Sequence, residues 1–254
     1  AKENLKAVVA AVVKQDKRLT MYYGDEVIVD IDREFLDTNG VRQSMIVNLR
    51  DWSDNYFDRK CDEFAKPFVD EGDYIGALKA ELNRIDVCSQ KGMGETFDGS
   101  IGAASVFMPF GGVNQLTPST VMAAKPPVNG FTHTVTASAF ACYPRLMKHS
   151  PFTGAIYSVL ASVAKLVSAG VKRDEIRLSL QEFFKRLGNV RSRWGEPLGA
   201  LLGALDAQLG LKTAAIGGKD SMSGTFENID VPPTLISFAM GITDDRTIVS
   251  NVFD

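Results

Sequence analysis

Cysteine and histidine are scarce in this chain of 254 residues. Its three cysteines, Cys61, Cys88 and Cys142, are an odd number and include no CxxC pair. Neither a disulfide framework nor a zinc site is therefore indicated, and we expect a reducing compartment, the cytoplasm. The two histidines, His133 and His149, lie just before a predicted strand and beside a predicted helix start. In such places a capping or surface role is more common than general-base catalysis.

Long apolar runs and an excess of one charge are missing as well. No apolar run approaches the roughly 18 residues that cross a bilayer, and the opening AKENLKAVVA lacks the pattern of a secretory signal. Lys and Arg number 28 against 31 Asp and Glu, with the signs mixed along the chain. No stretch could neutralise several phosphates in a row, so neither a nucleic acid nor a membrane is an expected partner.

The chain is predicted to have three parts. Residues 1–50 contain a helix-like run, ENLKAVVAAVV, and a strand-like run, RLTMYYGDEVIVDID, followed by a TNG turn signal. Residues 51–86 are polar and rich in charge, with helical periodicity at their end, which suits a linker with a helix. The dense apolar patterning starts at residue 87 and runs to 254, and its length is sufficient for a full core.

The third part is predicted to be an α+β domain, with a mostly antiparallel sheet and helices packed on one face. The segments ASVFMPF, STVMAAKPPV, HTVTASAFAC, EIRLSLQEFF, TAAIGG and IDVPPTLISFAMGI are predicted strands. The first helix follows Ser150 as its cap and ends at Gly170, with the sequence SPFTGAIYSVLASVAKLVSAG. The second, EPLGALLGALDAQLG, is predicted to end at Gly210.

The short run AAIGGKDSMSGT has the residue types of a loop that holds phosphate and a metal ion. Its polar and flexible members are Gly217, Gly218, Lys219, Asp220, Ser221 and Ser223. Glycine N–H groups, a lysine and hydroxyls can bind an anion, and a carboxylate offers the oxygen that Mg²⁺ prefers. A Walker A loop is excluded, because Thr213 and Asp220 stand where that pattern needs Gly and Ser or Thr. From spacing alone, a tight turn with solvated side chains stays open.

Several segments together resemble one family. These are AAIGGKDSMSGTFENIDVPPTLISFA, RWGEPLGALLGALDAQLGL, IRLSLQEFFKRLG, SPFTGAIYSV and CSQKGMGETFDGSIGAASVFMPFGGVNQLTP. They resemble the second half of the large phosphoribosylformylglycinamidine synthases, whose two halves are each related to aminoimidazole ribonucleotide synthetase. IVDIDREFLDTNG also resembles the end of the preceding domain. The resemblance implies that 1–50 is the remnant of a synthetase C-terminal-like domain, 51–86 a linker, and 87–254 a synthetase N-terminal-like domain.

The resemblance implies a part of an ATP-dependent carbon–nitrogen ligase of de novo purine biosynthesis. The parent would convert formylglycinamide ribonucleotide, glutamine and ATP to formylglycinamidine ribonucleotide. This fragment would supply half of a pseudo-dimer with an auxiliary nucleotide site, and no catalytic residue is assigned to it. Its partners would be the remaining domains of the parent, or a second copy in a homodimer. A purely structural domain without nucleotide binding is the alternative, and a free-standing kinase-like relative is less expected.

The resemblance also assigns site residues. Lys91 and the loop from Gly217 to Ser223 would face the phosphates of ATP or ADP, Gln115 the base or ribose, and Asp220 the Mg²⁺ ion; a solvated surface lysine is the other interpretation of Lys91. The chain departs from the family pattern at Thr120, Thr153 and Ala161, where relatives commonly have Glu, His and Glu. Because a divalent cation needs several oxygen ligands, we expect a weakened Mg²⁺ site.

Overall fold

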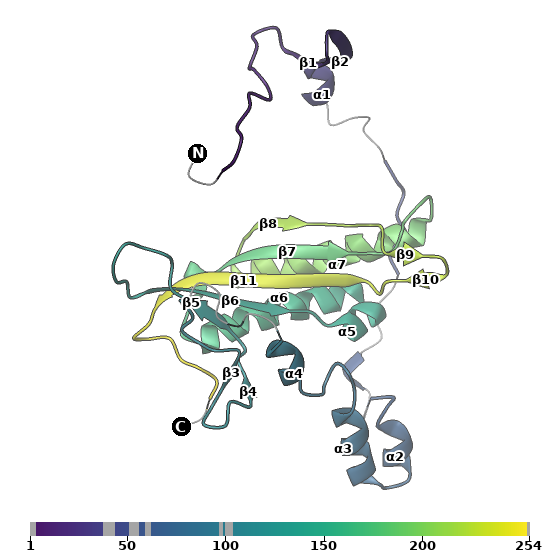
Figure 1. The fold of residues 1–254 in the computed structure, drawn as a ribbon. Helices are drawn as coiled ribbons and strands as arrows, with labels where there is room; N and C mark the ends of the chain where they lie inside the picture. Colours follow the sequence, from purple (N-terminus) through teal and green to yellow (C-terminus); the bar gives the residue numbers. More distant parts are fainter. Residues whose placement is uncertain are drawn as a thin grey trace. The chain divides into compact units, whose positions relative to one another are not determined.

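The fold is known from a computed structural model that describes residues 4–37, 44–50, 56–58, 62–96, 99 and 104–252 (Figure 1). The chain forms two compact units, Ala1–Ile46 and Val47–Asp254. The predicted TNG turn at 38–40, part of the predicted linker, and Cys61 lie outside the described residues. The predicted boundaries at residues 50 and 86 stay predictions.

The smaller unit contains a β-hairpin followed by a short helix. Strand β1 (Arg18–Tyr23) pairs antiparallel with β2 (Glu26–Asp32), and α1 (Arg33–Asp37) follows. Gly24 makes the turn with a φ of 60°, which glycine adopts without strain. The strand-like pattern of RLTMYYGDEVIVDID is therefore confirmed.

The helix predicted for ENLKAVVAAVV is wrong. Residues 4–14 have no regular secondary structure. Val8, Val9, Val12 and Val13 are exposed by 76–99% of their surface. An apolar helical face is stable mainly when it packs on something, and a segment of this length is marginal alone. No described residue covers these valines.

The larger unit is built on a five-stranded sheet. Its strand order is β5 (Met122–Ala124), β6 (Thr134–Ala141), β11 (Thr234–Asp244), β7 (Arg177–Phe183) and β8 (Ala215–Lys219). Every neighbouring pair is antiparallel except β7 and β8, which are parallel. The mostly antiparallel sheet is confirmed, although the predicted first strand ASVFMPF contributes only an isolated bridge from Ser105 to Ala124 and the start of β3.

Two long helices, α6 (Pro151–Ser168) and α7 (Arg191–Leu211), cover one face of the sheet (Figure 1). The start of α6 is confirmed, because the Ser150 hydroxyl accepts a hydrogen bond from the Thr153 N–H at 3.1 Å. The predicted bounds of α7 are wrong at both ends. This helix begins at Arg191, passes through Gly210 and ends where Lys212 adopts a left-handed φ of 54°.

The core lies between these helices and the sheet. Alternate strand residues such as Leu178 and Leu235 are fully buried against helix residues such as Val159 and Leu166. Among the described residues, α6 is the one helix that is long and apolar enough to cross a membrane by length and composition alone. Its buried face belongs to this core, so the helix fits the role of a core helix.

Shorter elements flank the sheet. They are η1 (Tyr56–Asp58), α2 (Lys66–Asp70), α3 (Tyr74–Leu82), α4 (Lys91–Gly94), β3 (Phe110–Gly111), β4 (Thr117–Pro118), α5 (Pro144–His149), η3 (Arg173–Glu175), β9 (Thr225–Phe226) and β10 (Ile229–Asp230). The helix expected at the end of the linker is α3, whose N-cap Asp73 accepts a hydrogen bond from the Gly76 N–H. Segment 104–107 pairs with β5, so α4, β3 and β4 belong to the β5 edge.

The second face of the sheet carries apolar side chains that no described element buries. Met122, Phe140, Phe183, Met240 and Ile242 are exposed by 38–60% of their surface. The register places them on the face opposite the helices, since their neighbours in the strands are the buried core residues. The sheet therefore has one covered and one open face.

Candidate functional site

The glycine-rich segment is divided between a strand and a loop. Gly217, Gly218 and Lys219 belong to β8, and the loop starts at Asp220. Pairing with β7 holds Gly217, Gly218 and Lys219 extended, so the loop is shorter than the predicted run from Gly217 to Ser223, and the phosphate contacts assigned to these three residues stay a prediction. An extended strand directs successive N–H groups to opposite sides, so these three cannot all converge on one anion.

The two adjacent glycines differ in whether packing requires glycine at their positions. A Cβ atom on Gly218 would lie 2.3 Å from the Leu180 carbonyl oxygen, so only glycine permits this close approach of β8 to β7. A Cβ atom on Gly217 would meet no atom within 4 Å. Packing therefore explains Gly218, whereas the space beside Gly217 is open.

The loop after Asp220 is anchored to the end of β7. The Ser221 N–H donates to the Glu182 carbonyl at 3.1 Å, and the Phe184 N–H donates to the Ser221 carbonyl at 2.8 Å. The hydroxyls of Ser221 and Ser223 lie 2.9 Å apart and hydrogen-bond to each other. The two predicted hydroxyl donors are thus brought together in a backbone held at fixed points.

Lys219 and Asp220 stand at the exposed edge of the sheet. Lys219 is in register with Gln181 of β7, so its side chain belongs to the open face. Both residues are exposed, and no described residue forms an ion pair with either. The edge thus offers one cation and one carboxylate to a ligand or a second protein surface.

Glu182 is a site residue that the sequence analysis missed. It is in register with the buried Leu235, and only 5% of its surface is exposed. Its Oε1 atom is buried and has no hydrogen-bond partner in the described part of the chain. Burial, and then the nearby Asp220 carboxylate, raise the pKa of Glu182 to about 7. The period of two in EIRLSLQEFF was the available signal, since Leu178, Leu180 and Glu182 share a face.

Lys91 and Gln115 lie at the opposite edge of the sheet from this loop. Lys91 opens the short helix α4 and pairs with Glu95, whose oxygen lies 3.4 Å from its Nζ. Gln115 is exposed between β3 and β4 with a φ of 50° and lines the same small cavity as Glu95. Because α4, β3 and β4 adjoin β5, and β8 is the other edge strand, the predicted nucleotide residues form two separate groups.

The three departures from the family pattern occupy different places. Thr120 lines a small cavity beside the end of α6, and Thr153 accepts a hydrogen bond from the Ser150 hydroxyl at 2.9 Å. Ala161 lies one turn before Lys165 on α6, and the Lys165 Nζ donates to the Phe140 carbonyl at 2.8 Å. Burial lowers the pKa of Lys165. The side chain at position 161 therefore offers no oxygen ligand to a metal ion.

The surroundings of the described cysteines and histidines indicate structural roles. Cys88 and Cys142 are free and half-buried, and burial raises the pKa of the Cys142 thiol, which disfavours the nucleophilic thiolate. His133 Nδ1 lies 2.7 Å from the Asp245 carboxylate. The centroid of the His149 ring lies 5.5 Å from that of the Tyr56 ring.

A group of possible metal ligands, His133, Asp244 and Asp245, lies beside the end of β11. Lys125 Nζ is 2.5 Å from Asp245, and Arg246 is 2.6 Å from Asp244. These ion pairs hold the pKa of both aspartates below their usual range and already neutralise their charge. The group is therefore a salt-bridge network.

No protein-family model matches the chain. Curated relatives are the phosphoribosylformylglycinamidine synthase subunits PurL of Thermoplasma acidophilum, 22% identical over 245 residues, and of Picrophilus torridus, 25% identical over 248 residues. Each alignment covers 96% of this chain but only 30% and 31% of the relative. The chain thus spans about a third of the length of the curated relatives that it matches.

Solved structures of similar fold come from Thermotoga maritima. The structure of PurLQS aligns with a TM-score of 0.63 at 14% identity, over 92% of this chain and 33% of that one. PurL complexed with ATP aligns with a TM-score of 0.62 at 14% identity, with the same coverage. These alignments support the α+β fold and its sheet with helices on one face.

Proposed function

We propose that this chain, a homologue of a segment of the phosphoribosylformylglycinamidine synthase subunit PurL, acts as part of an ATP-dependent carbon–nitrogen ligase in purine biosynthesis. The parent would use ATP to activate the formyl amide oxygen of formylglycinamide ribonucleotide, and ammonia from glutamine would replace that oxygen. The observation that carries the proposal is the alignment along 96% of the chain together with the shared fold. We expect such an enzyme in the cytoplasm.

Within that parent, this segment would supply an auxiliary site for ATP or ADP. The anchored loop offers the Ser221 and Ser223 hydroxyls, and Lys219 beside it offers a cation. Phosphate oxygens accept hydrogen bonds from such donors, so the loop suits a phosphate group better than a base. Gly217, with open space beside it, would let a phosphate approach the backbone closely.

A second related domain would complete this site. Lys91 and Gln115 belong to one sheet edge and Lys219 to the other, so one copy cannot surround a nucleotide with both groups. The exposed apolar face of the sheet lies between these edges. If a related domain packs on that face by a two-fold axis that runs parallel to the strands, each edge meets the opposite edge of its partner. The partner would be a domain of the parent, or a second copy of this chain.

Mg²⁺ should contribute little at this site. Asp220 would be its main ligand. Glu182 is buried, and because its pKa is raised to about 7, much of it is the neutral acid near pH 7. A hard divalent cation needs several oxygen ligands, and Asp220 with a partly neutral Glu182 supplies few. Phosphate contacts would then carry the binding.

The segment alone should have neither ligase nor glutaminase activity. A glutaminase needs an activated cysteine, and burial raises the pKa of Cys142. His133, one of the two histidines, is hydrogen-bonded to the Asp245 carboxylate, 2.7 Å from its Nδ1. A coupled assay should therefore detect no ATP hydrolysis that depends on formylglycinamide ribonucleotide. Such hydrolysis by the isolated chain would contradict this assignment.

A thermal-shift titration tests the auxiliary site. A ligand at about 100 times its dissociation constant stabilises the folded state by roughly 2.7 kcal/mol, so weak and tight binding are distinguishable. We expect small shifts with ADP and with sulfate that barely change on adding Mg²⁺ and that shrink in Lys219→Ala. Lys212→Ala removes a lysine that caps α7 before β8 begins, and it should leave the thermal shifts unchanged. Micromolar and strongly Mg²⁺-dependent ADP binding would contradict the weakened metal site.

A structural domain that only completes the pseudo-dimer is the second candidate, because the open apolar face supports it without any ligand. Light scattering at tens of micromolar chain should detect a dimer, with Phe140→Glu shifting it to monomer. Phe226→Glu, at an exposed position on β9, is the matched control and should not. A dimer that binds no nucleotide would favour this candidate, and a clean monomer would contradict it.

A further inference from the structure

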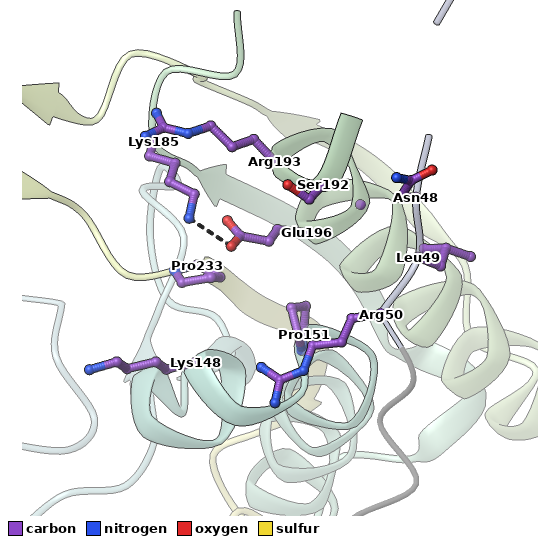
Figure 2. A pocket seen from close by; sticks show the side chains of 11 residues that line it. Asn48, Leu49, Arg50, Lys148, Pro151, Lys185, Ser192, Arg193, Glu196 and Pro233 are labelled. Atoms are coloured by element: carbon purple, nitrogen blue, oxygen red, sulfur yellow. Dashed lines mark ion pairs between the residues drawn. The ribbon is translucent and has the colours of Figure 1, made fainter. Parts of the chain in front are cut away.

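Two cavities adjoin at the amino-terminal ends of α6 and α7. The first, of about 230 Å³, has Pro151 of α6 and Ser192 of α7 in its wall (Figure 2). The second, of about 420 Å³, is lined by Arg145 of α5. Arg50 and Lys148 line both cavities, so the two form one continuous hollow, here called the basic groove. None of the residues of the glycine-rich loop lines it, which separates it from the proposed nucleotide site.

Positive charge exceeds negative charge in the basic groove. Its lysines and arginines are Arg50, Arg145, Lys148, Lys185 and Arg193. Arg145 pairs with Asp62, and Arg193 pairs with Asp230, which lies outside the groove. Lys185 pairs with Glu196 at 2.8 Å (Figure 2). In the part of the chain that the structure describes, no carboxylate pairs with Arg50 or Lys148, so both keep their charge for a partner.

Arg186 and Arg191 add to this charge beside the groove. The Arg186 carbonyl accepts a hydrogen bond from Arg193 Nη1 at 2.7 Å, and the Arg191 carbonyl accepts one from the Asn48 N–H at 3.3 Å. Both arginines are exposed, and no described carboxylate pairs with either. Among the described residues, Glu63 is the one unpaired carboxylate in the lining. Tertiary structure thus gathers cations that are far apart in the sequence.

The basic side chains do not converge on one point. Figure 2 shows the Lys148 side chain directed away from Arg50, with Arg193 on the other side of the cavity. A compact anion carries its charge on a single group, so it cannot contact all of these cations. Separate anionic groups along one extended chain match cations that are spread over a surface. The arrangement therefore favours a polyanionic chain over a small anion.

Glu196 adds a need for hydrogen-bond donors. Its Oε1 lies 2.8 Å from the Lys185 Nζ, whereas its Oε2 is buried and has no hydrogen-bond partner among the described residues. Buried polar groups are nearly always satisfied, and an acceptor without a donor is unfavourable. A peptide backbone carries an N–H donor at nearly every residue, whereas the phosphodiester backbone of DNA carries none. Of the polyanionic chains, an acidic peptide meets both requirements.

We propose that the basic groove is a docking surface for an acidic segment of a partner protein, one with several Asp or Glu side chains in an extended stretch. Carboxylates of that segment would pair with Arg50 and Lys148, and a backbone N–H would donate to Glu196 Oε2. The positive ends of the α6 and α7 dipoles lie at the same place and add to the attraction. The inference does not depend on nucleotide binding at the glycine-rich loop.

Fluorescence anisotropy with the full 254-residue chain tests this proposal. The probe is a fluorescein-labelled peptide that alternates Glu and Ala over about 12 residues, roughly 40 Å when extended. We expect saturable binding that weakens by about threefold or more when NaCl is raised from about 50 to about 200 mM, because surface ion pairs are screened. A peptide with Gln in place of each Glu should not bind.

Variants locate the binding. Arg50→Gln and Lys148→Gln should each weaken binding of the Glu peptide by about threefold or more, because each removes one unpaired cation. Lys172→Gln is the matched control, since this exposed lysine follows the opposite end of α6, and it should leave the affinity unchanged. Absence of saturable binding up to about 1 mM peptide would overturn the docking surface. Equal weakening by Lys172→Gln and Lys148→Gln would overturn it as well.

Two further ligands test the kind of partner. A Glu peptide with an N-methylated backbone keeps every carboxylate but has no backbone N–H donor. It should bind about threefold or more weakly than the parent peptide, because Glu196 Oε2 stays without a donor. Equal affinity of the two peptides would overturn the role of Glu196. Tighter binding of a single-stranded DNA of equal charge would overturn the assignment to a peptide, by making the groove a nucleic-acid surface.

Discussion

Replacing Glu182 by Gln should make the protein more stable relative to wild type as the pH rises from about 4 to about 8. The side chain is 5% exposed, and its Oε1 has no partner among the described residues. Burial, reinforced by the Asp220 carboxylate, raises the pKa of Glu182 from its usual 4.5 to about 7. The folded state therefore holds a proton that the unfolded chain releases between these two pH values.

The sign and size follow from proton linkage. Stability falls with rising pH wherever the folded state binds more protons than the unfolded state. The contribution of the protonated Glu182 is fully present below pH 4.5, is lost as the pH rises to about 7, and does not change further above that. The difference between 4.5 and about 7 corresponds to roughly 3 kcal/mol, which the Glu182→Gln variant would not lose because an amide does not titrate.

Urea unfolding in EDTA buffer at several pH values measures the effect. The free-energy difference between Glu182→Gln and wild type should change by roughly 3 kcal/mol in favour of the variant between about pH 4 and pH 8. Any constant cost of burying the introduced amide cancels in this comparison. Glu175→Gln, at an exposed position on η3, is the control and should show no such change. A difference that is independent of pH would refute the reasoning.

Two further predictions concern packing. Gly218→Ala should destabilise the protein by more than about 1 kcal/mol, since its Cβ would lie 2.3 Å from the Leu180 carbonyl oxygen. Gly217→Ala should change stability by less than about 0.5 kcal/mol, because its Cβ would meet no atom within 4 Å. Equal effects of the two variants in thermal unfolding would contradict this difference in packing. Ser162→Ala should cost about 1–3 kcal/mol, because the hydroxyl of Ser237, 2.9 Å away and fully buried, loses its partner. The double variant with Ser237→Ala should cost less than the sum of the single ones, and strict additivity in urea unfolding would contradict the pairing.

Local patterns in the sequence determined the fold class and most of its long elements. Ser150 followed by Pro151 predicts where α6 begins, and the hydroxyl of Ser150 accepts the Thr153 N–H as that pattern requires. Alternation in EIRLSLQEFF predicts β7 and puts Leu178 in the core. These features depend on neighbours along the chain, so one sequence is sufficient to find them. The ends of α7 were predicted poorly, because Lys212 rather than Gly210 takes the left-handed conformation.

Tertiary structure alone decided how the site is divided. Lys91 and Lys219 belong to opposite edges of the sheet because strand order places β5 and β8 four positions apart, and strand order is not encoded in local spacing. Likewise, only the pairing of β8 with β7 shows that Gly218 serves a close backbone approach. The burial of Glu182 depends on segments from elsewhere in the chain, and its raised pKa follows from that burial. Sequence determines which groups are available, and long-range packing determines their neighbours and their protonation.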